Sequence, residues 1–260
     1  MVTNIAAYRF VEIDDPDALA THLRTLAESL NLLGTVLVAR EGLNLFLAGR
    51  ASEIDTFVSE LRADARFCAI RVKYSRSASQ PFGRLKVKVK PEIISFRREH
   101  PSPEAGRARA VAPVDLARWI GQGQDDDGRR LVLLDTRNRQ EVVHGTFAGA
   151  LTLPIDKFTE LPDAIAACRA QLENATVVSF CTGGIRCEKA ALWLQAEGIA
   201  DVFQLDGGIL DYFEQVGGLG YEGNCFVFDA RVSVDSGLRA TRAHDAAGAL
   251  RPASVSTAPE

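Results

Sequence analysis

A cysteine and an arginine separated by four residues carry the strongest chemical signal in the sequence. Cys181 directly follows the apolar run 176–180, and the loop 181–186 (Cys-Thr-Gly-Gly-Ile-Arg) leads into a helix expected at 187–197. The N–H groups of such a loop and the helix N-terminus attract an anion, and Arg186 adds a permanent positive charge, so the thiol ionises readily. We therefore predict that Cys181 and Arg186 are catalytic and that an anion-binding loop is formed by Thr182, Gly183, Gly184 and Ile185.

Three further residues could assist this loop. Asp135 and Arg137 stand at the carboxyl end of the expected strand 131–135, the end where open α/β sheets place ligand sites. They could face the Cys181 pocket, but a pair that fixes the loop is the favoured interpretation. Cys187 lies in the first helical turn, and both inert packing and an auxiliary thiol role stay open for it.

Other polar or thiol side chains favour structural interpretations. Cys68 and Cys168 are expected to be small buried core residues, because free cysteine usually packs inertly. Glu188 and Lys189 are expected to solvate and cap the start of the helix.

Composition restricts the cofactors and the location of the protein. The four histidines lack metal-ligand spacing, and no dinucleotide-binding or P-loop glycine motif occurs, so no metal and no bound cofactor is expected. The apolar runs are strand-sized, far short of the ~20 residues of a membrane span, and no secretion signal opens the chain. Five cysteines, an odd number, argue against a secreted disulfide framework. We expect a cytoplasmic protein without membrane contact.

The charge is unevenly distributed along the chain. The net charge is −4, yet residues 71–98 contain nine lysines and arginines and a single glutamate. A focused basic segment favours an anionic partner such as RNA. The alternative is that the lysines alternating along 85–89 only solvate the outer face of a strand. The RNA-binding candidates are Arg84, Lys86, Lys88 and Lys90.

Hydrophobic periodicity predicts two domains, and both are of the α/β class. Residues 1–98 show the order βαββαβ, which is typical of a ferredoxin-like (acylphosphatase-like) domain. Asp15 and Pro16 favour the start of the first helix, which should run to about Leu33, where Gly34 stops it. The expected elements are strands at 4–12, 35–40, 43–48 and 69–75 and helices at 16–33 and 52–61.

The rest of the chain is expected to contain a linker, a second domain and a tail. Residues 99–113 are rich in Pro, Ala and Arg and lack periodicity, which indicates a linker. Residues 114–220 alternate helix and strand, which predicts a parallel α/β sheet. The C-terminal segment 221–260 should be mostly a mobile tail, because it holds few large apolar residues towards its end.

Several motifs together resemble known proteins. The segments 133–138, 145–150, 181–190 and 205–210 look like a rhodanese domain, and with Cys225-Phe-Val-Phe-Asp-Ala-Arg-Val232 they resemble the rhodanese-containing tRNA uridine hydroxylase family over most of residues 1–235. The resemblance implies a ferredoxin-like domain followed by a rhodanese domain, and oxygen-dependent formation of 5-hydroxyuridine at the wobble position of tRNA. It makes molecular oxygen a co-substrate and the anticodon region the partner. Cys181 then matches the cysteine that carries a persulfide, which implies a persulfide sulfur donor.

Four functions stay open on the sequence alone. A plain sulfurtransferase could use the same Cys181 persulfide. A phosphatase is disfavoured, since phosphatase loops place one more residue between cysteine and arginine. A non-enzymatic RNA-binding module would use the basic segment but would leave the thiol loop unexplained. The fourth, a tRNA-modifying oxidoreductase, uses both features. A structural zinc site is not expected, because only Cys225 follows Cys187.

Overall fold

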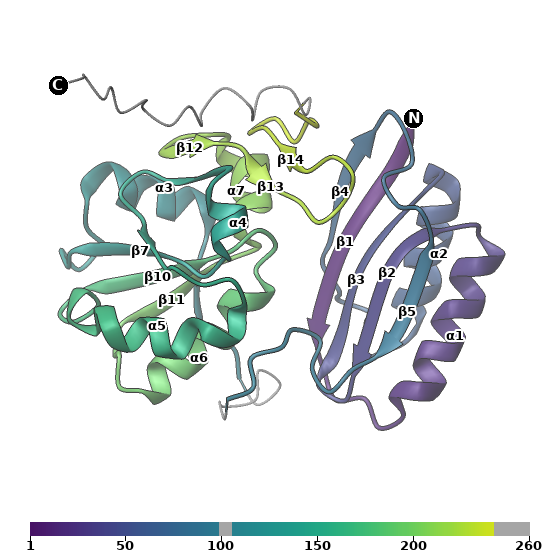
Figure 1. Ribbon diagram of the computed structural model, residues 1–260, viewed down its shortest axis with the longest axis horizontal. Coiled ribbons are helices and arrows are strands. Elements are labelled where there is room, and N and C mark those ends of the chain that lie inside the picture. Colours follow the sequence, from purple (N-terminus) through teal and green to yellow (C-terminus); the bar gives the residue numbers. More distant parts are fainter. Residues whose placement is uncertain (99–105, 242–260) are drawn as a thin grey trace, which may run out of the picture.

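Two α/β domains lie side by side in a computed structural model that describes residues 1–98 and 106–241 (Figure 1). The greater part of the expected linker, 99–105, and the end of the expected tail, 242–260, lie outside the described residues. In the part of the chain that the structure describes, no helix is both long and apolar enough to cross a membrane.

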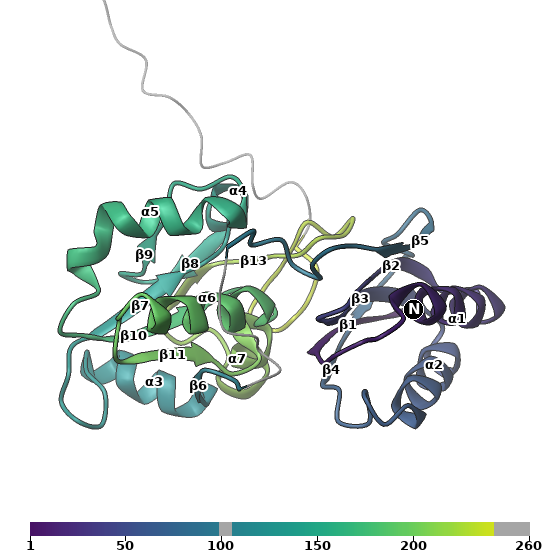
Figure 2. The ribbon, with the colours of Figure 1, turned by 90° about the horizontal axis from the view of Figure 1, so that it is seen from below.

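The first domain is a mainly antiparallel sheet with the strand order β4-β1-β3-β2-β5, of which only β5 runs parallel to its neighbour β2. Helices α1 and α2 cover one face, and the other face, here called the open face, is turned toward the second domain (Figure 2). The ferredoxin-like fold is confirmed, with β5 as an added edge strand. The elements are β1 (Val2–Phe10), α1 (Pro16–Ser29), β2 (Leu33–Ala39), β3 (Gly42–Gly49), α2 (Ala51–Ala63), β4 (Val72–Ser77) and β5 (Leu85–Val89).

Local chemistry explains where α1 starts, but not where it ends. The Asp15 side chain accepts a hydrogen bond from the Ala18 N–H at 2.9 Å, and Pro16 opens α1, as expected. The helix ends four residues earlier than expected, and Gly34 lies inside β2 instead of stopping α1. Gly34 has φ +141°, and a Cβ there would lie 2.0 Å from the Phe46 carbonyl oxygen. Glycine is therefore required by a close approach of two strands.

The second domain is a parallel sheet with the strand order β6-β11-β10-β7-β9, covered on both faces. Alternate strand residues pack against α5 and α6 on one side and against α3 and α7 on the other. The parallel α/β sheet expected here is confirmed. Its elements are β6 (Arg109–Val111), α3 (Pro113–Gln122), β7 (Leu131–Asp135), α4 (Arg139–Val142), β8 (Gly145–Phe147), β9 (Leu151–Thr152), the 3-10 turns Phe158–Glu160 and Arg169–Gln171, α5 (Leu161–Cys168), β10 (Thr176–Phe180), α6 (Ile185–Ala196), β11 (Val202–Leu205) and α7 (Gly208–Val216).

Two expectations about connecting segments are corrected. Arg109–Val111, inside the expected linker, is strand β6 and pairs with β11. Residues 221–241, inside the expected tail, are ordered: β12 (Tyr221–Gly223) pairs with β8, and β13 (Cys225–Phe226) pairs with β14 (Ser233–Val234). The sequence did not predict these strands, because strands of two or three residues have little periodicity of their own and form by pairing with another strand.

Candidate active site

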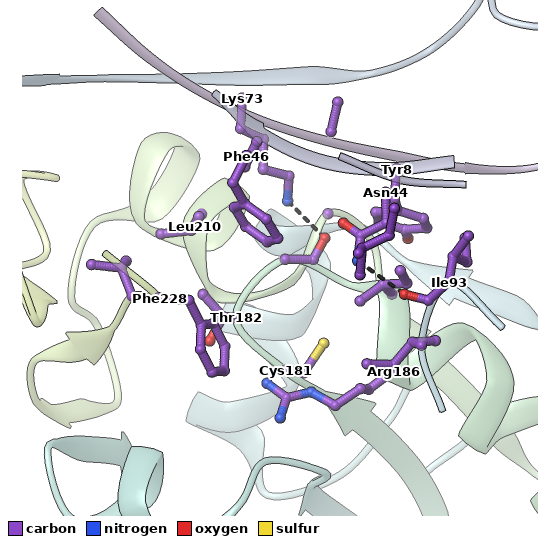
Figure 3. Close-up of a pocket in the computed structure, with 18 of the residues that line it drawn as sticks. Tyr8, Asn44, Phe46, Lys73, Ile93, Cys181, Thr182, Arg186, Leu210 and Phe228 are labelled. Atoms are coloured by element: carbon purple, nitrogen blue, oxygen red, sulfur yellow. Dashed lines mark hydrogen bonds between the residues drawn. The ribbon is translucent and has the colours of Figure 1, made fainter. Parts of the chain in front are cut away.

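The loop 181–186 connects β10 to α6, at the carboxyl end of a central strand. The Cys181 sulfur accepts a hydrogen bond from the Gly184 N–H at 3.1 Å, which curls the loop around the sulfur. Gly184 has φ +101°, a conformation that residues with a side chain rarely adopt, and a Cβ there would lie 2.9 Å from the Tyr8 hydroxyl oxygen. Cys181 is buried, yet it lines a cavity together with Thr182, and the sulfur stands above the guanidinium of Arg186 (Figure 3).

The loop favours the thiolate form of Cys181. Burial alone raises the pKa of Cys181, but a hydrogen bond from the Cys187 thiol, the charge of Arg186 and the loop N–H groups lower this pKa to about 5. Burial and the neighbouring thiolate raise the pKa of Cys187 well above its ordinary value, so Cys187 stays protonated and donates. Cys187 therefore stabilises the thiolate of Cys181 by donating a hydrogen bond to its sulfur.

Arg186 is itself held by a carboxylate that the sequence analysis did not single out. Its guanidinium donates two hydrogen bonds, both of 2.6 Å, to the two oxygens of Glu141 in α4. Glu141 is fully buried and also accepts from the Asn138 N–H at 3.1 Å. The spacing of Asn138 and Glu141 predicts only the second contact, which is local. No local pattern indicates a contact across 45 residues.

Asp135 and Arg137 form a second buried ion pair, with 2.6 Å between Asp135 Oδ2 and Arg137 Nη2. Arg137 also donates to the Gly145 carbonyl at 2.7 Å, and Thr146 donates to Asp135 at 2.8 Å. Neither charged residue lines the cavity. The geometry agrees with the favoured interpretation that this pair fixes a loop.

The cavity has a volume of about 940 Å³ and lies between the open face of the first sheet and the loop 181–186. Figure 3 shows Phe46 and Asn44 on the sheet side and Phe228 beside the loop. The volume is at the upper end of the ~300–1,000 Å³ typical of pockets for small organic ligands. A nucleobase with its sugar and phosphate would fit inside.

Residues of the first domain fix the loop in place. Lys73 on β4 donates to the Gly183 carbonyl at 3.1 Å and pairs with Asp211 at 3.0 Å (Figure 3). Arg71 pairs with Asp206 and Asp211. Part of the basic segment 71–98 thus pairs with the second domain and is not available to a partner.

Glu188 and Lys189 correct an expectation, because they join the domains instead of solvating a helix start. Glu188 is buried and accepts from the Tyr8 hydroxyl at 2.9 Å and from Arg107 at 2.8 Å. The Lys189 ammonium is fully buried and contacts carboxylate oxygens of Glu41 at 2.8 Å and of Glu92 at 2.7 Å.

The C-terminal segment 225–234 closes one side of the cavity. Arg231 pairs with Asp229 at 2.5 Å and donates to Ser75 on β4 at 2.7 Å, so this segment contacts both domains. The Phe228 ring lies 5.9 Å from the Arg186 guanidinium and is 49% exposed.

Lys86, Lys88 and Lys90, here called the β5 lysines, are exposed and alternate with Leu85 and Val87, which pack on the helix side. Side chains alternate along a strand, so the β5 lysines belong to the open face. Lys90 lines the cavity, and Arg84 is exposed just before β5.

The remaining thiols differ from expectation. Cys68 is exposed and Cys168 is half-buried, so neither is the buried core residue that was expected. Cys225 is buried behind Thr182, and burial raises its pKa to about 11. Within residues 1–98 and 106–241, no three His, Cys, Asp or Glu side chains are grouped as a metal ion requires.

Comparison with known proteins gives matches over both domains. A family model described as UPF0176 acylphosphatase like domain matches residues 2–93, and one described as Rhodanese-like domain matches residues 113–215. A tRNA uridine(34) hydroxylase of Xanthomonas campestris pv. campestris (strain 8004) is 66% identical over 239 residues, covering 92% of this chain and 94% of the relative. A tRNA uridine(34) hydroxylase of Xylella fastidiosa (strain 9a5c) is 59% identical over 239 residues, covering 92% of this chain and 93% of the relative.

Proposed function

The chain belongs to the tRNA uridine(34) hydroxylase family, and we propose that it hydroxylates uridine 34 of tRNA with Cys181 as the nucleophile. The observation that carries the role of Cys181 is its placement. Cys181 is a stabilised thiolate in the wall of a cavity that has room for a nucleotide. Soft thiolates add readily to electron-poor carbons, and C6 of uracil is one.

The chemistry of such an addition suits the reaction. A thiolate bound to C6 places electron density on C5, the carbon that is hydroxylated. One atom of molecular oxygen then becomes the C5 hydroxyl, and the other leaves as water with two electrons from a reductant of the thiol class. Loss of the C5 proton and of the thiolate restores the ring and frees Cys181. Arg186 and the loop N–H groups stabilise the thiolate that leaves.

The surroundings suit an RNA loop as the partner. The β5 lysines and Arg84 lie on the rim of the open face and would contact phosphates. Single-stranded RNA is read with its bases splayed out onto aromatic side chains, and Phe46 and Phe228 line the cavity. We infer that the anticodon loop is the partner and that the protein acts in the cytoplasm, where tRNA is used.

The test is mass spectrometry of tRNA nucleosides after reaction with purified protein under isotopically labelled oxygen. Wild type should yield labelled 5-hydroxyuridine, and Cys181→Ser should yield none. Cys68→Ser is the matched control, since Cys68 is exposed and does not line the cavity. Full labelled product from Cys181→Ser would contradict the proposal.

One observation favours a second candidate, a sulfurtransferase. The N–H groups around the Cys181 sulfur could equally hold the outer sulfur of a persulfide. Thiosulfate turnover by a protein that never hydroxylates tRNA would select this function and would point to a persulfide donor as the partner.

A further inference from the structure

Phe46 of β3 is an aromatic side chain on the open face of the first sheet. The strand register places Phe46 of β3 in a row across the sheet with Thr35 on β2 and Ala6 on β1 as its direct neighbours. The same row continues to Lys86 at one edge and to Lys73 at the other. Both direct neighbours of Phe46 are therefore small, and the row ends in exposed Lys86 on one side and in Lys73, paired with Asp211, on the other.

Tyr8 and Phe228, which also line the cavity, make ring contacts that Phe46 lacks. The Tyr8 hydroxyl donates to Glu188, and its ring packs edge-on against Phe10 with 5.9 Å between centroids. Phe228 packs edge-on against Phe226 at 5.1 Å. Among the described residues, no other ring packs on Phe46, which is half-buried and points into the cavity (Figure 3).

An aromatic ring on the middle of a βαββαβ sheet, with an exposed lysine at the edge of the same row, resembles the arrangement that binds single-stranded nucleic acid. RNA recognition motifs stack unpaired bases on aromatic residues of such a sheet face. Proteins without sequence preference combine the same rings with a basic groove along the backbone. Here β3 lacks the sequence signature of that motif, so the similarity lies in topology and in the face used.

We propose that Phe46 is a base-stacking subsite for a nucleotide flanking the one presented to Cys181. The proposal rests on the proposed function, because it assigns a further part of the same substrate. Two strand spacings, about 10 Å, separate the β3 backbone at Phe46 from the β4 backbone at Lys73. Lys73 in turn contacts Gly183 of the loop. Phe46 lines the cavity from the sheet side and Cys181 from the loop side, so the cavity can hold one base on the Phe46 ring and its neighbour at Cys181. Lys86, two strands away from Phe46 in the same row, is exposed and can contact a phosphate.

The experiment uses anticodon stem-loop RNA with the fluorescent base 2-aminopurine at position 33 or at position 35. Stacking on Phe46 should quench one of the two probes when wild-type protein binds. Phe46→Leu keeps apolar volume but removes the aromatic face, so this quenching should disappear and binding should weaken about 5- to 150-fold, the range that corresponds to loss of one stacked base. Phe46→Trp should restore both. Phe203→Leu is the control, since Phe203 is also half-buried but lies outside the cavity.

The readouts separate this proposal from the proposed function. Saturating RNA should return Phe46→Leu close to the wild-type kcat while KM stays raised, because the flanking base binds but does not react. Unchanged quenching and affinity in Phe46→Leu would overturn the subsite while leaving hydroxylation intact. Loss of kcat at saturation with unchanged quenching would also overturn it, since the ring would then contact the target base. Absence of hydroxylation by wild type would instead contradict the proposed function.

Discussion

The ionisation of Cys181 can be tested by its rate of reaction with a neutral disulfide such as 2,2′-dithiodipyridine across the pH range. With a pKa of about 5, Cys181 is already mostly thiolate at pH 6. An ordinary thiol, with a pKa near 8.5, is only about 0.3% thiolate at that pH. The rate for Cys181 should therefore be nearly flat from pH 6 to 8, whereas a cysteine-containing reference peptide should accelerate about 75-fold.

The absolute rate is a smaller effect, because a weaker base is also a weaker nucleophile. The advantage in thiolate fraction at pH 6 is about 300-fold, and a Brønsted slope of 0.4–0.5 over about 3.5 pKa units removes a factor of about 25 to 55. Cys181 should thus react about 5 to 12 times faster than the reference peptide at pH 6. The measurement is made by mass spectrometry of the modified peptide in a Cys68→Ser background, since Cys68 is exposed.

Variants of Cys187 test the cause of the shift. A hydrogen bond to a charged group contributes about 1.5–3 kcal/mol, and 1.36 kcal/mol corresponds to one pKa unit. Cys187→Ala should therefore raise the pKa of Cys181 by about one to two units, whereas Cys187→Ser keeps a donor and should preserve the wild-type profile. A Cys181 rate that rises with pH like that of the reference peptide would contradict the low pKa, and an unchanged profile in Cys187→Ala would contradict the role of the Cys187 hydrogen bond.

Three other perturbations have defined outcomes. Arg186→Ala should raise the pKa of Cys181, so that its rate in the same disulfide assay increases with pH. Arg186→Lys should give the same result, because one ammonium cannot replace the two parallel hydrogen bonds to Glu141. A wild-type profile in Arg186→Lys would refute this. Lys189→Met should lower the free energy of unfolding in urea by about 3 kcal/mol, because Glu41 and Glu92 lose their buried partner. An unchanged midpoint of urea unfolding would contradict the role of Lys189 in joining the two domains. Replacing all three β5 lysines by Gln should reduce the slope of log K for tRNA against log salt by about 0.7–0.9 for each phosphate that a lysine neutralises, without changing thiosulfate turnover. An unchanged slope would leave these lysines as a solvated strand face.

Local patterns predicted most of the fold and the reactive loop. The βαββαβ order, the cap at Asp15 and the strand-cysteine-glycine-helix arrangement around Cys181 all depend on residues close in sequence, where periodicity and turn chemistry act. The residues that pair with Arg186 and Lys189 were not predicted, because they are distant in the sequence. Glu141 reaches Arg186 across 45 residues, and Lys189 reaches Glu41 across 148. A charged residue that will be buried by a distant domain has the same local sequence as one that faces water.

Burial of Lys189 between two domains also imposes an order of events during synthesis. The core cluster of the first domain is built from residues up to Val87, and the ribosome adds 97 more residues between Glu92 and Lys189. At 5–20 residues per second this takes about 5 to 20 s, during which Glu41, Glu92 and the open face stay in water. A sheet with an unpaired edge is prone to aggregate, and lysines on an edge strand oppose such pairing. The β5 lysines lie on the edge strand of the first sheet, where their charge opposes pairing with a strand of another chain while the open face is still in water.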